Sequence, residues 1–489
     1  METAVSKALA WSLIDQLGRQ GIRFGLSIVL ARLLTPAEYG LMGMLLVFLM
    51  IAQSFVDFGL SAGLIQRKEI TADYATSVFC LNVVAAIVLA GVLCAISPLV
   101  AWFYAQPVLR PLLCAASLSI VIGSFGIIQT TLMTRDIDFR TQATVALVAT
   151  SGSGAVALFM AWRGCGVWSL VGQSLADSLV GVVAIWWLSP WRPTGRFHWA
   201  CIRGLWPFSS RLLASGLLNT AFQNLYALII GRVYGPSDLG FYTRASTMAS
   251  LPANSVTAMT QRVMFPVFAR VQDDKCRLCR DFRKTLRGIE AGYFPLMTGL
   301  AAVAEPAVRC LLSDKWLPCV PYLRILCFCG MLYPLHALHL NVLTAQGRSD
   351  LFFRLEIIKK LLVVLVIAAT CWISVQAMVV GTLISSVICL WVNGYYTRKL
   401  IGYGWWMQIS DLLPVGALST AMAVPVWAVS WTETWNPWGL LAVQMLVGGM
   451  LYAAMVVLLR RSLYADIFEG LMVAWSRRPG AGGVSQNVS

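Results

Sequence analysis

Residues 77–103 read SVFCLNVVAAIVLAGVLCAISPLVAWF, a run without a charged side chain. A helix that crosses a bilayer needs roughly 20 consecutive, mostly apolar residues, so this stretch is long enough to span a membrane by itself. Hydrophobic residues make up 58% of the chain and charged residues 12%, against roughly 25% charged residues in soluble domains. The chain is therefore predicted to be an all-α, polytopic membrane protein.

Similar apolar segments occur on both sides of this run and bring the total to about fourteen predicted spans. The first seven are residues 9–31, 41–65, 77–103, 111–133, 143–162, 167–189 and 205–231. The remaining seven are residues 240–266, 286–312, 319–345, 355–373, 376–397, 409–431 and 437–459. The longest predicted connections, about 190–204 and 267–285, are basic and too short to hold a soluble catalytic domain.

The 37 Lys and Arg residues orient these spans, because cytoplasmic loops of membrane proteins are enriched in basic residues. With the N-terminus inside, most basic residues fall in predicted cytoplasmic segments. The opposite side holds only Arg32, Arg110, Arg163, Arg232, Arg309, Lys315 and Arg324. An error in the span count would disrupt this alternation, so we predict that both termini are cytoplasmic.

The net charge of +15 also has a simpler explanation than nucleic-acid binding. The basic residues form short clusters between apolar runs, as membrane topology requires, so we expect no nucleic-acid partner.

Residues 1–15 lack the pattern of a cleaved signal peptide. Cys276 and Cys279 form the only CxxC and have no second pair beside them, so we expect neither a metal nor a cofactor.

A segment of ten residues occurs twice in the chain, 200 positions apart. Residues 31–40 read ARLLTPAEYG and residues 231–240 read GRVYGPSDLG. The matched positions are Arg32 and Arg232, Pro36 and Pro236, Glu38 and Asp238, and Gly40 and Gly240. Pro, an acidic residue and Gly are also ordinary turn chemistry, but the equal spacing and equal place between two spans favour duplication.

Duplication predicts two parallel six-helix lobes, since six spans separate the copies. The N-terminal lobe would comprise residues 1–190 and the C-terminal lobe residues 191–400. Two further helices would occupy residues 401–462, and residues 463–489 would form a disordered cytoplasmic tail. Parallel repeats of this kind are a transporter architecture, with substrate between the lobes near the midplane.

The first predicted span carries Asp15, Arg19 and Arg23 at four-residue intervals, which places them on one stripe of a helix. Charges within a bilayer are costly and usually face a water-filled cavity or a partner. One interpretation is a basic stripe that lines a cavity. The alternative is an Asp15–Arg19 ion pair near the cytoplasmic interface, with Arg23 reaching toward the headgroups.

Polar residues also interrupt the seventh and eighth spans. Arg244, Asn254 and Arg262 lie in the eighth, which is too polar to face lipid and either lines a cavity or is buried in the bundle. Asn219, Gln223 and Asn224 lie in the seventh. These amides could bind sugar hydroxyls or bond neighbouring helices.

The acidic residues Asp57, Asp177 and Glu305, like Asp15, lie within or near apolar runs. They could bind a coupling ion, but neutralising a buried Arg is the commoner role of such a residue. His336 and His339 could titrate near neutrality or form interior hydrogen bonds. The basic segment of residues 270–287, RVQDDKCRLCRDFRKTLR, is either a solvated linker or a surface helix on anionic headgroups.

Several segments resemble the polysaccharide flippases of the Wzx type, in the WzxC-like branch of the multidrug/oligosaccharidyl-lipid/polysaccharide exporter superfamily. They are LARLLTPAEYGLMGMLLVF, VDFGLSAGLIQRKEIT, GRVYGPSDLGFYTRASTMASLPANSVTAMTQRVMFPVFARVQDD, RGCGVWSLV, LSDKWLPCVPYLRILC and NVLTAQGRSD. The resemblance runs from about residue 7 to about residue 400 and leaves the last two spans without a signature.

The resemblance implies two six-helix lobes plus two helices around a central cavity, in the bacterial inner membrane. It also implies transport of an undecaprenyl-diphosphate-linked oligosaccharide between leaflets by alternating access, with a polysaccharide polymerase as a candidate partner and membrane lipids as the surroundings. The basic residues of the first helix that are important in related flippases correspond here to Arg19 and Arg23. We therefore expect transport, with no catalytic residues.

Two other classes of function remain. A multidrug or cation antiporter of the same superfamily should place acidic residues in its cavity, whereas the cavity candidates here are mostly cationic: Arg19, Arg23, Arg244 and Arg262. A membrane polysaccharide polymerase or ligase should have a large periplasmic loop, whereas every predicted outside loop is short. Both comparisons favour a flippase for an anionic, lipid-linked substrate.

Overall fold

The computed structural model describes residues 18, 20–57, 59–67, 70–431 and 436–458. These residues are almost entirely helical, and no strand occurs among them. Because hydrocarbon offers no hydrogen-bond partner to a peptide group, a chain that crosses it must satisfy its backbone within each segment, and a helix does so. The all-α class predicted from the sequence is confirmed.

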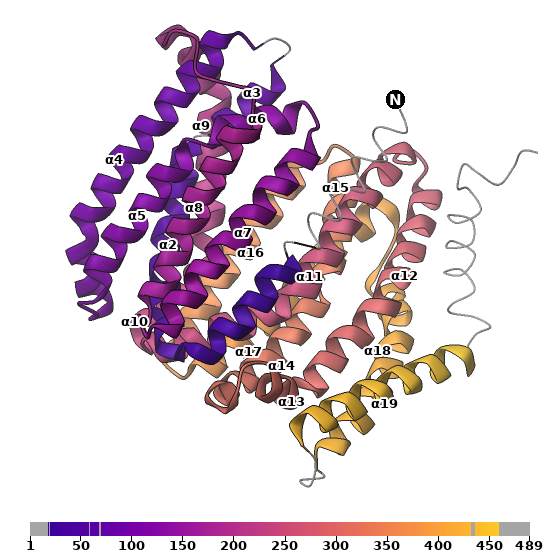
Figure 1. Cartoon of the computed structure of the whole chain (residues 1–489). Helices are drawn as coiled ribbons and strands as arrows, with labels where there is room; N and C mark the ends of the chain where they lie inside the picture. The colour runs from indigo at the N-terminus through magenta and orange to yellow at the C-terminus, as the bar shows by residue number, and fades with distance from the viewer. Residues whose placement is uncertain (1–17, 19, 58, 68–69, 432–435, 459–489) are drawn as a thin grey trace, which may run out of the picture. The chain divides into compact units, whose positions relative to one another are not determined.

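The helices follow one another with short connections (Figure 1). After a helix at residues 20–33 come α2 (Pro36–Asp57), α3 (Leu60–Gln66), α4 (Ala72–Tyr104), α5 (Leu109–Ser124), α6 (Ile127–Arg135), α7 (Phe139–Trp162), α8 (Trp168–Leu188), α9 (Trp199–Gln223) and α10 (Leu225–Val233). Then come α11 (Pro236–Arg270), α12 (Lys275–Ala302), α13 (Ala304–Leu311), the 3₁₀ turn η1 (Asp314–Cys319), α14 (Val320–Met331) and α15 (Tyr333–Ala345). The last are α16 (Ser349–Thr370), α17 (Val375–Ile401), α18 (Trp405–Ala428), the 3₁₀ turn η2 (Val429–Trp431) and α19 (Pro437–Leu458).

Every predicted span overlaps a helix or a pair of helices joined at a break. Eight helical segments of the described chain are long and apolar enough to cross a membrane, and up to eleven if each of three bent pairs is one span. The bends are 43° between α5 and α6, 40° between α9 and α10, and 68° between α12 and α13. A total of fourteen spans stays a prediction. The connections are shorter than predicted, because α9 and α12 begin within the basic segments.

The helix starts follow local sequence signals. At α2, the Thr35 N–H donates to Glu38 Oε2 at 2.6 Å and the Glu38 N–H donates to Thr35 Oγ1 at 3.4 Å. This reciprocal pair is a capping box, which satisfies two backbone donors that the first helical turn leaves without partners. The side chains of Asp138, Asp274 and Ser374 cap α7, α12 and α17 in the simpler way, each by one bond.

The chain divides into two compact units, Met1–Thr243 and Arg244–Ser489, and the division falls within α11. In the first unit, α4, α5, α8 and α7 lie side by side in that order (Figure 1). α9 packs on α2, α3 and α4. The predicted division into lobes at residues 190 and 191 remains a prediction.

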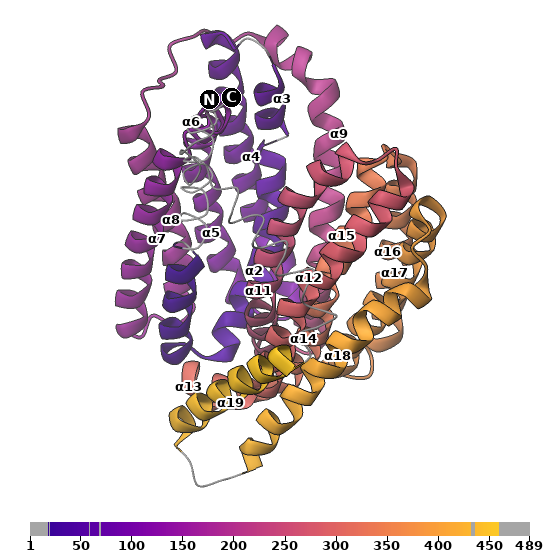
Figure 2. The ribbon, with the colours of Figure 1, turned by 90° about the vertical axis from the view of Figure 1, so that its right-hand side faces the viewer.

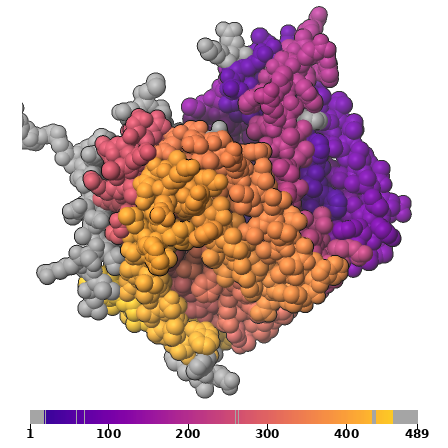
Figure 3. All heavy atoms as spheres, turned by 180° about the vertical axis from the view of Figure 1, so that it is seen from behind, coloured from indigo at the N-terminus to yellow at the C-terminus, as the bar shows by residue number. Residues whose placement is uncertain are grey.

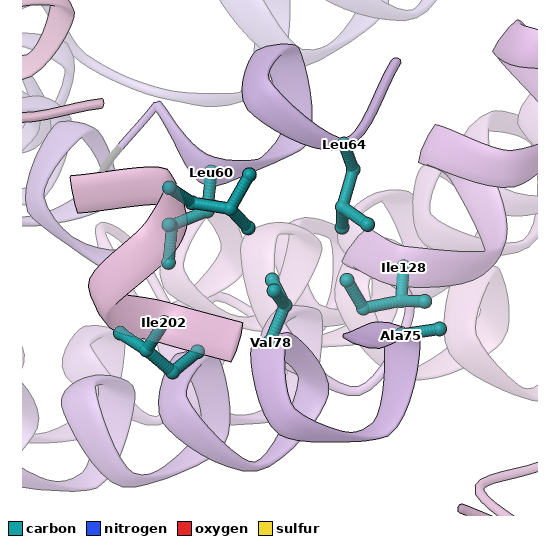
Figure 4. Packing of buried hydrophobic residues seen from close by; sticks show 7 residues of the cluster. Leu60, Leu64, Ala75, Val78, Ile128 and Ile202 are labelled. Atoms are coloured by element: carbon teal, nitrogen blue, oxygen red, sulfur yellow. The ribbon is translucent and has the colours of Figure 1, made fainter. Parts of the chain in front are cut away.

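One apolar cluster of the first unit joins the consecutive helices α3 and α4 to α6 and α9, which come later in the chain (Figure 4). Its buried members are Leu60 and Leu64 of α3, Ala75 and Val78 of α4, Ile128 of α6, and Ile202 and Leu205 of α9. The short helices α3 and α6 thus pack on each other, α6 also packs on α4, and α3 also packs on α9.

The connection between α8 and α9 is bound to the start of α4 by its backbone. The N–H groups of Gly195, Arg196 and His198 donate to Thr76 Oγ1, Asp73 Oδ1 and Ser77 Oγ at 3.1, 2.7 and 2.9 Å. A Cβ on Gly195 would collide with the backbone of Ala72, so the close approach requires glycine here. These bonds hold the connection between α8 and α9 against the start of α4.

The two copies of the repeated segment lie against each other within the first unit. A Cβ on Gly40 of α2 would collide with the carbonyl oxygen of Pro236, and a Cβ on Gly240 of α11 would collide with that of Pro36. The contact is reciprocal, as a two-fold relation between duplicated segments produces. The glycines at the matched positions are thus explained by close backbone packing rather than by turn geometry.

In the second unit, α12 contacts α14, α15, α17, α18 and α19, and α17 packs between α14 and α16 (Figure 2). The atoms of α16 and α17 form a continuous outer surface (orange in Figure 3). Exposed side chains of these two helices include Leu361, Leu365, Ile384 and Trp391, and Trp372 is exposed in the turn between them. An apolar surface this large is what a protein turns to lipid.

A buried carboxylate joins α12 to α18. Asp411 has no exposed side-chain surface and accepts from Nε and Nη2 of Arg283 at 2.8 and 2.7 Å. It also accepts from Nε and Nη2 of Arg287 at 3.1 and 2.5 Å, and from the Tyr403 hydroxyl at 3.1 Å. Two guanidinium groups thus share one carboxylate, which leaves the cluster with a surplus positive charge.

Replacing Gly40 or Gly240 by Ala should destabilise the protein by about 3 kcal/mol, because the new methyl group meets backbone atoms that cannot rotate away. Thermal unfolding of the purified protein in detergent measures the effect. The matched control is Gly416→Ala in α18, where a Cβ meets nothing within 4 Å. Equal midpoints for Gly40→Ala and Gly416→Ala would refute the close contact.

Asp411→Asn should lower stability by about 3 kcal/mol, since two guanidinium groups would lose the buried charge that both contact. Asp350→Asn is the control. Hydrogen bonds from Arg348 lower the pKa of Asp350 to about 2, but this pair is exposed and such pairs contribute little to stability. If the two variants unfold at the same temperature, Asp411 does not hold α12 and α18 together.

Candidate functional site

The basic stripe predicted on the first helix lies partly within the described residues. Asp15 and Arg19 fall outside them. Arg23 is exposed on the helix of residues 20–33. That helix packs on α7, where Leu26 lies against Gly154 and Leu30 shares a core with Ala157. Packing on α7 therefore holds the backbone that carries Arg23 and leaves its charge accessible.

The amides of the seventh predicted span separate into two groups. Asn219 and Gln223 are exposed and stand four residues apart on one face of α9. Asn224 instead donates from Nδ2 to the carbonyl oxygen of Thr220 at 2.8 Å, at the break between α9 and α10. Asn219 and Gln223 are thus accessible, whereas the Asn224 side chain bonds to the backbone at the bend.

The polar residues of α11 also differ in their accessibility. Arg244 is buried, and its guanidinium carbon lies 5.5 Å from the ring centre of the fully buried Trp316, a cation–π contact. Asn254 is exposed on the same helix. Arg262 lies on the helix, but its side chain is not among those the structure describes. In this conformation Arg244 has a structural partner, and Asn254 is the accessible polar group.

Each described acidic candidate has a partner within its own unit. Asp57 Oδ1 accepts from the Ser61 hydroxyl at 2.5 Å, and Asp177 Oδ1 accepts from the Ser153 hydroxyl at 3.2 Å. Glu305 lies 3.5 Å from Arg309 and 3.8 Å from Arg324, the arrangement expected of a charge-pairing residue. Asp57 and Asp177 are partly buried and carry no ion pair among the described residues, so they retain the chemistry of an ion ligand.

The two histidines of α15 belong to a buried network with α17. His336 Nε2 and Nδ1 lie 3.0 Å from the Ser386 hydroxyl and from Asn393 Nδ2, and His339 Nδ1 lies 2.8 Å from the Thr397 hydroxyl. This geometry matches interior hydrogen bonding. Within the part of the chain that the structure describes, no group of three His, Cys, Asp or Glu residues could hold a metal ion.

The basic segment after α11 is mostly the start of α12. Leu278, Phe282 and Leu286 are fully buried, whereas Cys276, Arg277 and Lys284 lie on other faces of the helix. The segment is therefore the amphipathic first part of the long helix α12. The linker interpretation holds only for the short stretch before Lys275.

Two acidic residues that are buried in the structure were not among the candidates from the sequence. Asp411 lies in the predicted span 409–431 and binds Arg283 and Arg287, which had been counted only as cytoplasmic basic residues. Glu290 lies in the predicted span 286–312 and is completely buried. Both could have been found by asking which acids fall inside apolar runs, but their partners, or lack of them, depend on packing.

Solved structures of two transporter types share this fold. The lipid II flippase MurJ, in an inward closed conformation, matches with a TM-score of 0.75 and 13% identity over 94% of this chain and 99% of its own. An inward-facing multidrug resistance MATE family transporter of the MOP superfamily matches with a TM-score of 0.59 and 14% identity over 81% and 98%. At these identities the likeness concerns the fold alone.

Relatives in sequence have more specific names. The succinoglycan biosynthesis transport protein ExoT of Rhizobium meliloti (strain 1021) is 25% identical over 98% of this chain and 97% of its own length. The lipopolysaccharide biosynthesis protein WzxC of Escherichia coli (strain K12) is 28% identical over 72% of each chain. The family described as "Polysaccharide biosynthesis protein" matches residues 29–321. The resemblance predicted from the sequence is confirmed, and the chain belongs to this family of polysaccharide biosynthesis proteins.

Proposed function

We propose that this chain is a flippase for lipid-linked oligosaccharides. It moves an undecaprenyl-diphosphate-linked repeat unit from the cytoplasmic to the periplasmic leaflet of the bacterial inner membrane. The observation that carries the proposal is the similarity to ExoT, a named transport protein, over nearly the whole of both chains. A lipid II flippase shares the fold, so the architecture is compatible with this proposal.

The physical task of such a protein is to lower the cost of moving a charged headgroup through hydrocarbon. A diphosphate stripped of water has a very unfavourable free energy unless cations and hydrogen-bond donors replace its hydration. Arginine suits this role because it stays charged and presents paired N–H donors to phosphate oxygens. We assign the diphosphate to Arg19, Arg23 and Arg262, with Arg244 joining if it leaves Trp316.

The sugars need a different surface. Hydroxyl groups are recognised by side chains that both donate and accept hydrogen bonds, and amides do both. Asn219, Gln223 and Asn254 are exposed amides in the described chain, and we assign them to the oligosaccharide. The undecaprenyl tail requires no site of its own, because it can remain in the surrounding lipid throughout.

The transport cycle follows from the repeated architecture. Parallel repeats in transporters move against each other as rigid bodies around a binding site, which gives alternating access. The reciprocal packing of Gly40 and Gly240 supplies a close contact between the two copies. In this scheme both termini are cytoplasmic, the chain acts without covalent catalysis, and a polysaccharide polymerase takes the product at the periplasmic face.

Replacing Arg19 and Arg23 together by Gln should abolish export of the polysaccharide, because the diphosphate would lose two compensating charges. Complementation of a strain that lacks its own flippase measures export, and membrane fractionation measures insertion. Normal export by the double variant at normal abundance would contradict the assignment.

The matched control removes a charge elsewhere on the protein. Arg163 lies in the turn between α7 and α8, with its guanidinium near the rings of Phe159 and Trp162 at 5.2 and 5.8 Å. Arg163→Gln should leave export unchanged. An equal loss in both variants would show that export depends on overall charge rather than on the first helix.

A further inference from the structure

Glu290 of α12 is a carboxyl group for which the proposed transport mechanism has no use. Its residue has no exposed surface, and neither carboxyl oxygen has a hydrogen-bond partner. An ionised carboxylate in such a place would be far less favourable than the neutral acid, because nothing replaces its hydration. In this conformation Glu290 therefore carries a proton.

The groups around Glu290 do not change this conclusion. Titratable groups of neighbouring elements touch α12 at other residues: His339 of α15 and Tyr403 lie beside the Phe282 ring, Asp411 of α18 binds Arg283 and Arg287, and Tyr452 of α19 reaches Ala291, while Cys327 of α14 and Tyr333 of α15 lie near Tyr293. On α12 itself, the Tyr293 hydroxyl donates to the carbonyl oxygen of Gly330. Tyr452 donates to the carbonyl oxygen of Ala291. None of them donates to the carboxyl oxygens of Glu290.

A cation stands one turn away. Arg287 precedes Glu290 by three residues, about 4.5 Å along the helix axis, and side chains at this spacing lie on one face. The Arg287 guanidinium is turned to Asp411, which Arg283 also contacts. Its side chain is 29% exposed. Asp411 needs only one arginine for charge balance, and Arg287 is the one with an alternative partner.

We propose that Glu290 is a proton-binding site whose ionisation is coupled to the exchange of Arg287 between Asp411 and Glu290. When Asp411 keeps Arg283 and releases Arg287, Arg287 turns to Glu290 and pairs with it. The O–H bond of the carboxylic acid breaks, both electrons stay on the carboxylate, and the proton passes to water beside Arg287.

The charges balance at each stage. In the packed state, one carboxylate and two guanidinium groups carry a net charge of +1 beside a neutral acid. After the exchange, two ion pairs carry no net charge and one proton has left. This exchange accounts for two features together: the second arginine on Asp411 and the unpartnered acid one turn away. It extends the proposed function by making each conformational cycle bind and release a proton.

Infrared spectroscopy of the purified full-length protein tests the proton directly, without any transport assay. The C=O stretching band of a protonated carboxylic acid should be present in the wild type and lost in Glu290→Gln. Glu305→Gln, which alters a half-exposed acid already paired with Arg309 and Arg324, should retain the band. A band of unchanged intensity in Glu290→Gln would overturn the proposal.

The exchange of partners has its own variants. Asp411→Asn leaves Arg287 without its carboxylate, so Arg287 should turn to Glu290 and abolish the band although Glu290 is still present. Arg287→Gln keeps Asp411 paired with Arg283, and should preserve the band at alkaline pH where the wild type loses it. A band that persists in Asp411→Asn, or that titrates alike in Arg287→Gln and the wild type, would overturn the coupling.

Proteoliposomes connect the site to transport. With a pH-sensitive dye in the lumen and a lipid-linked oligosaccharide in the membrane, the wild type should move protons as it flips lipid. Glu290→Gln should reduce proton movement to that of protein-free liposomes. Flipping by the wild type without proton movement would overturn the proposed role of Glu290 and would leave the proposed flippase function standing. Absence of flipping, with the infrared results as expected, would overturn the proposed function and leave the proton site.

Discussion

Hydrocarbon provides no hydrogen-bond partner and no screening for charge, and most of this structure is a response to that constraint. Backbone groups are satisfied within helices, and the breaks in those helices are covered by local donors such as the Asn224 amide at the bend between α9 and α10. Polar side chains follow the same rule. Ser, Thr and His residues inside the bundle bond to neighbouring backbone or to each other.

Buried charged side chains are also subject to this constraint, and most of them have partners. Asp411 is surrounded by two guanidinium groups and a hydroxyl, so its burial is compensated more than once. Arg244 rests over the face of Trp316. Glu290 alone among these groups has no compensation, and a neutral acid is the state that tolerates this. A protein that moves a diphosphate must hold mobile positive charge, and the second arginine on Asp411 is a charge that can change partner.

The repeated segment connects packing with movement. Two glycines, one from each copy, let backbone approach backbone at a place where any side chain would collide. The Leu239 and Thr243 side chains of α11 lie against Gly43 of α2 beside this contact, so the two copies pack closely. The proposed function requires the two repeats to change their orientation, and this contact is one place where their segments meet.

The sequence by itself determined the class of fold, the approximate place of the long helices and the family, because uncharged runs such as residues 77–103 and family segments such as residues 31–40 and 231–240 are local patterns. It also pointed to Arg23, Asn219, Gln223 and Asn254, whose polarity in apolar surroundings is visible without a structure. Only the tertiary structure decided which polar groups have partners. Packing brings together residues that are far apart in sequence, such as Arg244 and Trp316, or Asp411 with Arg283 and Arg287. It also leaves Glu290 buried without a hydrogen-bond partner. Burial is a property of the whole packed bundle, so local sequence does not reveal it.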